Sequence, residues 1–156
     1  MQKDTFRIIK LVHLAVSVSL LVCIAIFIVV IQSGHAKGED TSLERILQTV
    51  AVVLSVGILL IGFNRFKRAM MAARNSPGSG EERMRQYMTA CITWWAMIEI
   101  PGFFAAICYF LTQNFAFIVL AGTHLLILLI FMPRKENIIV LLNLSTDEVA
   151  KLEGKN

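Results

Sequence analysis

The ionisable residue best placed to do chemistry in this chain is Glu99, which lies within the apolar stretch MTACITWWAMIEIPGFFAAICYFLTQ. Residues 87–111 are long enough to cross a bilayer as a helix, and Glu99 lies 12 residues from either end. An ionised carboxylate near the middle of a bilayer costs at least ~2.5 kcal/mol, so Glu99 is expected to be neutral, paired or both. Acids at this depth commonly bind protons or cations; the alternative is a protonated glutamate that joins two helices structurally.

The best candidate partner for Glu99 is His124, which follows it across the short turn TQNF. Counted from that turn at ~1.5 Å per residue, Glu99 lies about 18 Å deep and His124 about 13.5 Å deep, so contact is feasible. The alternative is a neutral imidazole that hydrogen-bonds a backbone carbonyl. His13 lies five residues into the first apolar run, and its side chain is expected to extend toward the lipid headgroups.

Small residues surround Glu99 on the predicted helix. Ala96, Gly102 and Ala106 fall within about 60° of Glu99 on a helical wheel. Small residues let a second helix approach closely in lipid. We therefore predict that this face contacts a second copy of the chain or other membrane subunits.

Pro101 adds a polar feature near the acid. Proline has no N–H, so the carbonyl of Met97 loses its helical donor. This free acceptor lies within one turn of Glu99, where a protonated carboxyl, a water molecule or an ion could use it.

Four apolar runs of at least 18 residues predict an all-α fold, a four-helix transmembrane bundle. The 156-residue chain is 56% hydrophobic, more than a soluble domain of this size could bury. Each run can cross a hydrocarbon core of ~30 Å as a helix. A transmembrane domain over residues 1–133 would contain these spans, followed by a cytoplasmic tail over 134–156; the predicted spans are residues 8–31, 46–63, 87–111 and 115–132.

The distribution of lysine and arginine predicts the orientation. With four spans, 13 of the 15 basic residues fall on the side that holds both termini and the second connection. The positive-inside rule places that side in the cytoplasm, so a multi-pass protein of the cell (inner) membrane with both termini inside is expected. The net charge of +4 is then a topological signal. The lipid bilayer is the expected partner, and nucleic acid is not.

Two further helical features are predicted outside the apolar runs. Good helix formers flank the turn NSPGSG, so the second and third helices are expected to project into the cytoplasm. In the tail, Ser145 and Glu148 have the spacing of a capping box and predict a short helix over 146–153. The apolar run 138–144 is expected to lie on the membrane surface or to dock on a partner.

The segment ARNSPGSGEERMRQYMTACITWWAMIEIPGFFAAICYFL resembles the second half of an ATP synthase c subunit, of the proteolipid rotor family. Arg74, Asn75 and Pro77 look like that family's cytoplasmic loop, and Glu99 matches its ion-carrying carboxylate. The resemblance covers about residues 46–111. It implies that the central two helices form a proteolipid-like hairpin that binds a proton or cation. The chain differs from the family in its bulkier second helix and its two further spans.

Three functions are compatible with these features. The leading expectation is proton or cation binding at Glu99 and His124, in an oligomer. The alternatives are a structural or assembly subunit of a larger membrane complex, and a small haem-binding electron carrier with His13 and His124 as axial ligands. The sequence has no hydrolase, phosphate-loop or Cys/His metal motif, so no enzymatic activity, no metal and no resident cofactor are expected.

Overall fold

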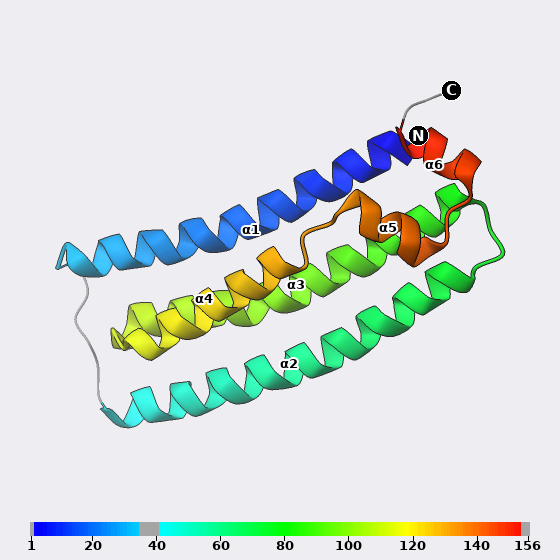
Figure 1. Ribbon diagram of the computed structural model, residues 1–156. Helices are drawn as coiled ribbons and strands as arrows, with labels where there is room; N and C mark the ends of the chain where they lie inside the picture. Colours follow the sequence, from blue (N-terminus) through cyan, green and yellow to red (C-terminus); the bar gives the residue numbers. More distant parts are fainter. Residues whose placement is uncertain (1, 35–40, 154–156) are drawn as a thin grey trace.

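The computed structural model describes residues 2–34 and 41–153 (Figure 1). Those residues form helices and no strand, which confirms the all-α fold class. Three long helices precede three shorter ones: α1 (Gln2–Gln32), α2 (Thr41–Asn75), α3 (Gly80–Thr112), α4 (Phe115–Ile130), α5 (Lys135–Leu142) and α6 (Thr146–Glu153).

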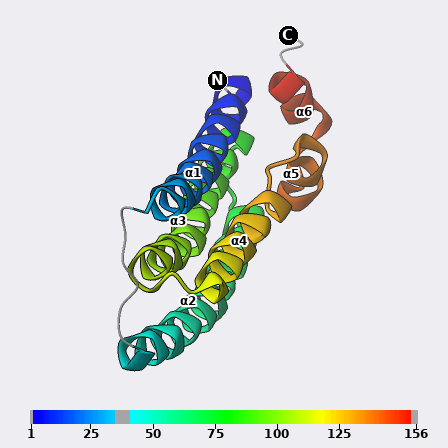
Figure 2. The same cartoon turned by 90° about the vertical axis from the view of Figure 1, so that its left-hand side faces the viewer.

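The helix α3 lies at the centre of the bundle, with α1, α2 and α4 packed around it (Figures 1 and 2). Successive long helices run in opposite directions, so α2 and α3 form an antiparallel hairpin and α1 runs alongside α3 in the same direction (Figure 1). The core is rich in α3 side chains such as Trp95 and Ile98, while large apolar residues such as Leu14 and Val53 are exposed on the outer helices. An apolar exterior of this kind suits a surface that faces lipid.

Three helices of the described chain are long and apolar enough to cross a membrane, namely α1, α2 and α3. The shorter α4 passes the same test only together with α5, as a pair bent by 68°. The described residues therefore hold three candidate spans, or four if the bent pair is one span. The count of four remains a prediction.

The helix α4 ends at Ile130, two residues before the end of the predicted span 115–132. Beyond that residue the backbone tightens, and the N–H of Met132 bonds the carbonyl of Leu129 at 3.2 Å. Pro133 follows and has no N–H with which to continue the helical pattern. The last carbonyls of α4 therefore need donors from elsewhere.

The turn between α3 and α4 confirms the predicted tight hairpin. Gln113 adopts the left-handed conformation with φ 60°, and its N–H bonds the carbonyl of Tyr109 at 2.7 Å. The side-chain oxygen of Asn114 accepts the N–H of Ala116 at 2.8 Å and so caps α4. The amide of Asn114 also donates to the carboxylate of Glu44, which ties this turn to α2.

The predicted helical extensions on both sides of NSPGSG are confirmed, since α2 continues to Asn75 and α3 begins at Gly80. Ser79 caps α3 by accepting the N–H of Glu82 at 3.4 Å. Deeper in the hairpin the two helices approach closely at Gly62. A Cβ atom at Gly62 would lie 2.8 Å from the ring of Trp94, so a side chain at this position would push α2 away from α3.

The tail folds back on its own bundle and is held there by Arg83. The guanidinium donates to the carbonyl oxygens of Leu142 and Asn143 at 2.8 and 3.2 Å, and to both oxygens of Glu148 at 2.8 Å. The capping box is confirmed, because Glu148 Oε2 accepts the N–H of Ser145 and the Ser145 hydroxyl accepts that of Glu148.

Part of the apolar run 138–144 packs on the protein itself, while Val140 and Leu141 of the same run are 76% and 37% exposed. Ile138 and Leu142 are both 0% exposed within the core that α1, α2 and α3 share with α5. In Figure 2 α5 lies beyond the end of α4 and α6 turns toward the first residues of α1. The tail is therefore an intramolecular clamp across the end of the bundle.

The clamp predicts a pH dependence that is centred on Glu148. Burial would by itself raise the pKa of this carboxyl, but the hydrogen bonds from Ser145 and Arg83 more than offset it, so the pKa lies below its ordinary value. A lowered pKa stabilises the folded tail above the ordinary glutamate pKa, and that contribution is lost as the pH falls through the lowered value. The protection of the α5 and α6 amides from hydrogen exchange, taken relative to the intrinsic exchange rate at each pH, should therefore fall at acidic pH.

The variant Glu148→Gln should show the same loss of protection at neutral pH, with a loss of about 1–3 kcal/mol in local stability. The exposed Glu136, which has no described partner, provides a matched control as Glu136→Gln. Equal protection of the tail in wild type and Glu148→Gln would contradict the clamp.

Candidate functional site

Glu99 finds its hydrogen-bond partner on α1, where the Ser19 hydroxyl lies 2.5 Å from Glu99 Oε1. Glu99 is half-buried and Ser19 is exposed, so the pair lies at the outer edge of the contact between α1 and α3. Both residues lie near the middle of their apolar runs, 8–31 and 87–111. The acid is thus paired with a neutral group and remains close to the bundle surface.

The Ser19 hydroxyl also lies 2.8 Å from the carbonyl oxygen of Val16. A hydroxyl has one proton to donate, so it can serve either Val16 or an ionised Glu99. When Glu99 is protonated, its O–H can donate to Ser19, and Ser19 to Val16. When Glu99 is ionised, Ser19 can turn its proton to the carboxylate, and the Val16 carbonyl keeps its ordinary helical donor.

His124 does not pair with Glu99. Its side chain is 1% exposed, and neither ring nitrogen has a hydrogen-bond partner among the residues described. The predicted contact is wrong because the two side chains leave α3 and α4 in different directions. Glu99 meets α1 at the bundle surface, whereas the Cβ of His124 packs in the interior, within 3.1 Å of where a Cβ on Gly102 would lie.

Ser17 is a second buried polar residue whose side-chain oxygen has no partner in the described chain. The hydrogen bond between His13 and Leu128 sets the register of the antiparallel helices α1 and α4. Ser17 lies four residues after His13 on α1, and His124 lies four residues before Leu128 on α4. Each is therefore about 6 Å along its helix from that bond. These two side chains therefore occupy one layer of the interior, an arrangement of donors and acceptors that suits a bridging water.

His13 does not extend to the headgroups as the sequence predicts. It is 4% exposed, and its Nε2 lies 2.9 Å from the carbonyl oxygen of Leu128, to which it donates. Its ring packs edge-on against Trp95 with centroids 4.8 Å apart. Leu128 lies in the last turn of α4, where carbonyls lack helical donors, so His13 caps this helix from α1. While His13 Nε2 donates to the Leu128 carbonyl, that nitrogen cannot serve as an axial ligand of a haem.

The predicted small-residue face divides between the interior and the surface. Ala96 is exposed beside Glu99, whereas Gly102 and Ala106 are buried. Gly102 packs against the side chains of Leu20 and His124, where an added Cβ would lie 3.0–3.1 Å from their atoms. The prediction that all three contact a partner is therefore wrong for Gly102 and Ala106, because both are already buried within the bundle.

Pro101 is buried, and α3 continues through it to Thr112. The proline leaves the carbonyl of Met97 without its usual helical donor, as predicted from its chemistry. Met97 is half-buried and faces α2, with its sulfur 3.2 Å from where a Cβ on Gly62 would lie. Its side chain therefore takes part in the contact between α2 and α3 and not in the pair made by Glu99.

The oxygen atoms around Glu99 suit a proton better than a metal ion. Within the described chain no group of three or more His, Cys, Asp or Glu residues could hold a metal. The described neighbours of the carboxylate offer one hydroxyl, and a Na⁺ or Ca²⁺ site needs several converging oxygens. A proton needs one acceptor and one hydrogen-bond partner, which this site provides.

Comparison with family models, with curated proteins and with solved structures finds no match to this chain. The resemblance of residues 46–111 to the proteolipids stays a prediction.

Ser19 is the functional candidate that sequence reasoning missed. A signal was available, since Ser19 lies at mid-depth of its apolar run as Glu99 does of its own. Two hydroxyl residues, Ser17 and Ser19, share that depth, and the sequence does not show which of them faces α3. Helix packing decides this by turning Ser17 inward and Ser19 toward the edge.

The capping role of His13 predicts that His13→Leu destabilises the protein. The variant leaves the Leu128 carbonyl without a donor in an apolar interior, which costs about 1–3 kcal/mol. Thermal unfolding in detergent should detect this loss, and His13→Gln, which retains an N–H donor, should lose less. Equal stability of His13→Leu and wild type would show that Leu128 needs no cap from α1.

Proposed function

We propose that this chain is a non-enzymatic membrane protein that binds and releases a proton at Glu99. Four spans, both termini in the cytoplasm and residence in the cell membrane belong to the proposal. The positive-inside distribution of basic residues supports the orientation. The proposal refines the expectation of a proton or cation by favouring the proton.

The observation that carries the proposal is the position of the Ser19 hydroxyl between Glu99 and the carbonyl of Val16. Rotation of one hydroxyl gives hydrogen bonds to the protonated and to the ionised carboxyl in turn. Neither state requires α1 and α3 to separate. A site of this kind can change its protonation state without rearranging the bundle.

Proton exchange is proposed to occur at the outer edge of the bundle. Glu99 is half-buried between exposed Ser19 and exposed Ala96. A second helix, from another copy or another subunit, could approach these small side chains closely. The resemblance to proteolipids also implies an ion-carrying carboxylate at this position. The chemistry is similar, while rotor function is not part of the proposal.

A structural role for Glu99 is the second candidate, and the same hydrogen bond favours it. A permanently protonated glutamate bonded to Ser19 would fasten α1 to α3 and never ionise. Assembly through the tail has less support, because the contacts of Arg83 and Glu148 already occupy the tail within the chain. Electron transfer through haem also has less support, because His13 caps α4.

Carbodiimide labelling tests whether Glu99 titrates, because the reagent modifies protonated carboxyls in apolar surroundings. Purified protein should be labelled at Glu99, and labelling should decrease as the pH rises. The variant Glu99→Gln should abolish labelling without loss of expression, and Glu136→Gln should leave it unchanged. Ser19→Ala should extend labelling to higher pH, since the ionised carboxylate loses its donor.

Proton flux into vesicles that contain the protein gives a second measurement, and Glu99→Gln should remove it. Labelling that is constant across the accessible pH range, with no difference in flux between wild type and Glu99→Gln, would overturn proton exchange and support the structural candidate.

A further inference from the structure

Three polar side chains on three different helices are buried in the bundle without a hydrogen-bond partner in the described chain: Ser17 on α1, Ser55 on α2 and His124 on α4. They are 6%, 2% and 1% exposed. The atoms concerned are the two hydroxyl oxygens and both ring nitrogens of His124. Buried polar atoms in proteins are nearly always bonded to protein or to ordered water, so these atoms need a partner.

Ser17 and His124 lie at one level of the bundle, because each is four residues from the bond between His13 and Leu128. On α3 the level of His124 is that of Gly102. A Cβ atom on Gly102 would lie 3.1 Å from the Cβ of His124. Gly102 therefore marks the level of this layer on the central helix.

Ser55 reaches the same level from α2. The hydrogen bond between Asn114 and Glu44 fixes how α2 lies against the hairpin of α3 and α4. Ser55 lies eleven residues from Glu44 along α2. Gly102 lies twelve residues from Asn114, so Ser55 and Gly102 differ in depth by one residue, or ~1.5 Å. Ser17, Ser55 and His124 thus form a polar layer across the bundle.

His124 lies on the helix that can join the other two. The helices α1 and α2 lie on opposite sides of α3, and α4 packs against all three (Figure 2). A neutral imidazole has one donor and one acceptor nitrogen, and each serine hydroxyl can both donate and accept. No direct hydrogen bond joins the three side chains. Water molecules bridge polar groups at such separations in many proteins.

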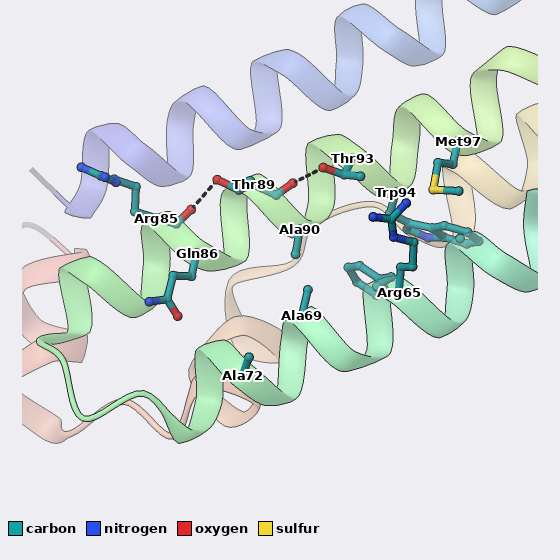
Figure 3. A pocket seen from close by; sticks show the side chains of 12 residues that line it. Arg65, Ala69, Ala72, Arg85, Gln86, Thr89, Ala90, Thr93, Trp94 and Met97 are labelled. Carbon is teal, nitrogen blue, oxygen red and sulfur yellow. Dashed lines mark hydrogen bonds between the residues drawn. The ribbon is translucent and has the colours of Figure 1, made fainter.

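The hydroxyls of the polar layer differ from other hydroxyls on the long helices. Thr89 and Thr93 donate to carbonyls one turn back in their own helix, at 3.2 and 2.9 Å (Figure 3). Thr112 does the same at 2.8 Å, although it is buried. Ser17 and Ser55 make no such bond. Their oxygens are therefore available to a ligand in the interior.

The polar layer is enclosed by protein. A groove of about 550 Å³ lies between α2 and α3 (Figure 3), and none of the three residues of the layer lines it. Their unpartnered atoms are also closed to solvent. A ligand at this level must be small and able to donate and accept several hydrogen bonds, as a buried water molecule does.

We infer that the polar layer binds internal water, with one molecule between Ser17 and His124 and a second between His124 and Ser55. One ring nitrogen of His124 donates to its water and the other accepts from its water. The serine hydroxyls bond the far sides of these waters. The two waters join α4 to α1 and to α2 at a level where the rest of the interior is apolar.

Solid-state NMR of the full chain in lipid bilayers tests this inference through the transfer of magnetisation from water to protein. The ring protons of His124 should receive magnetisation from water. Phe117 is equally buried two turns away on α4, and it should receive none over the same mixing time. The absence of transfer to His124 in the wild type would refute the water site.

Ser17→Ala and Ser55→Ala should each weaken the transfer to His124, because each removes one partner of a bridging water, and the double variant should abolish it. Thermal unfolding checks that these small substitutions leave the fold intact. The matched control is Thr123→Ala, which removes an exposed hydroxyl that is already bonded to the carbonyl of Val119 at 2.8 Å. Transfer in this control should equal that of the wild type.

Two outcomes with the variants would count against the site. Unchanged transfer in either serine variant would show that no water bridges that serine to His124. An equal loss of transfer in Thr123→Ala would show a general change of hydration and not the removal of a bridging partner.

Discussion

Polar groups inside a hydrocarbon layer are stabilised by partners within the protein, and this constraint accounts for two contacts that join α1 to the bundle. The Leu128 carbonyl at the end of α4 receives the N–H of His13, and the Glu99 carboxyl meets the hydroxyl of Ser19. Both bonds join α1 to the rest of the bundle. They place the first helix in register with α3 and α4, beyond what the packing of apolar side chains alone would specify.

The centre of the structure is α3, and its composition explains why. It carries both large rings and small residues in its buried part. Trp94 and Trp95 fill space between helices, while Gly102 and Ala106 allow close approach. One side of α3 is buried among the other helices, while Ile92, Ala96 and Ile100 are exposed on its outer side. Glu99 is only half-buried because it lies at the edge of the contact between α3 and α1, where Ser19 covers it in part.

The two ends of the bundle differ in chemistry. At the turn between α3 and α4, Asn114 and Glu44 close the structure with a few polar contacts. At the opposite end, α5 and α6 fold across the bundle and Arg83 holds them through bonds to two carbonyls and one carboxylate. One end is thus closed by a short turn, and the other by a folded tail.

The sequence by itself determined the helical class, the long apolar runs, the hairpin at Gln113 and the helix that follows Ser145. These features depend on local patterns: hydrophobic length, capping residues and turn residues, all of which act within a few positions. The same local chemistry identified Glu99 as exceptional, because a carboxylate in an apolar run needs a special environment wherever the run packs.

Tertiary structure decided what each polar residue meets. His13 turned inward as a cap, and His124 packed beside Gly102 rather than beside Glu99. Depth along a helix can be counted from the sequence, but the rotation of one helix against another depends on how all their side chains pack together. That rotation selected Ser19 as the partner of Glu99, and it also covered two of the three small residues expected to contact another subunit.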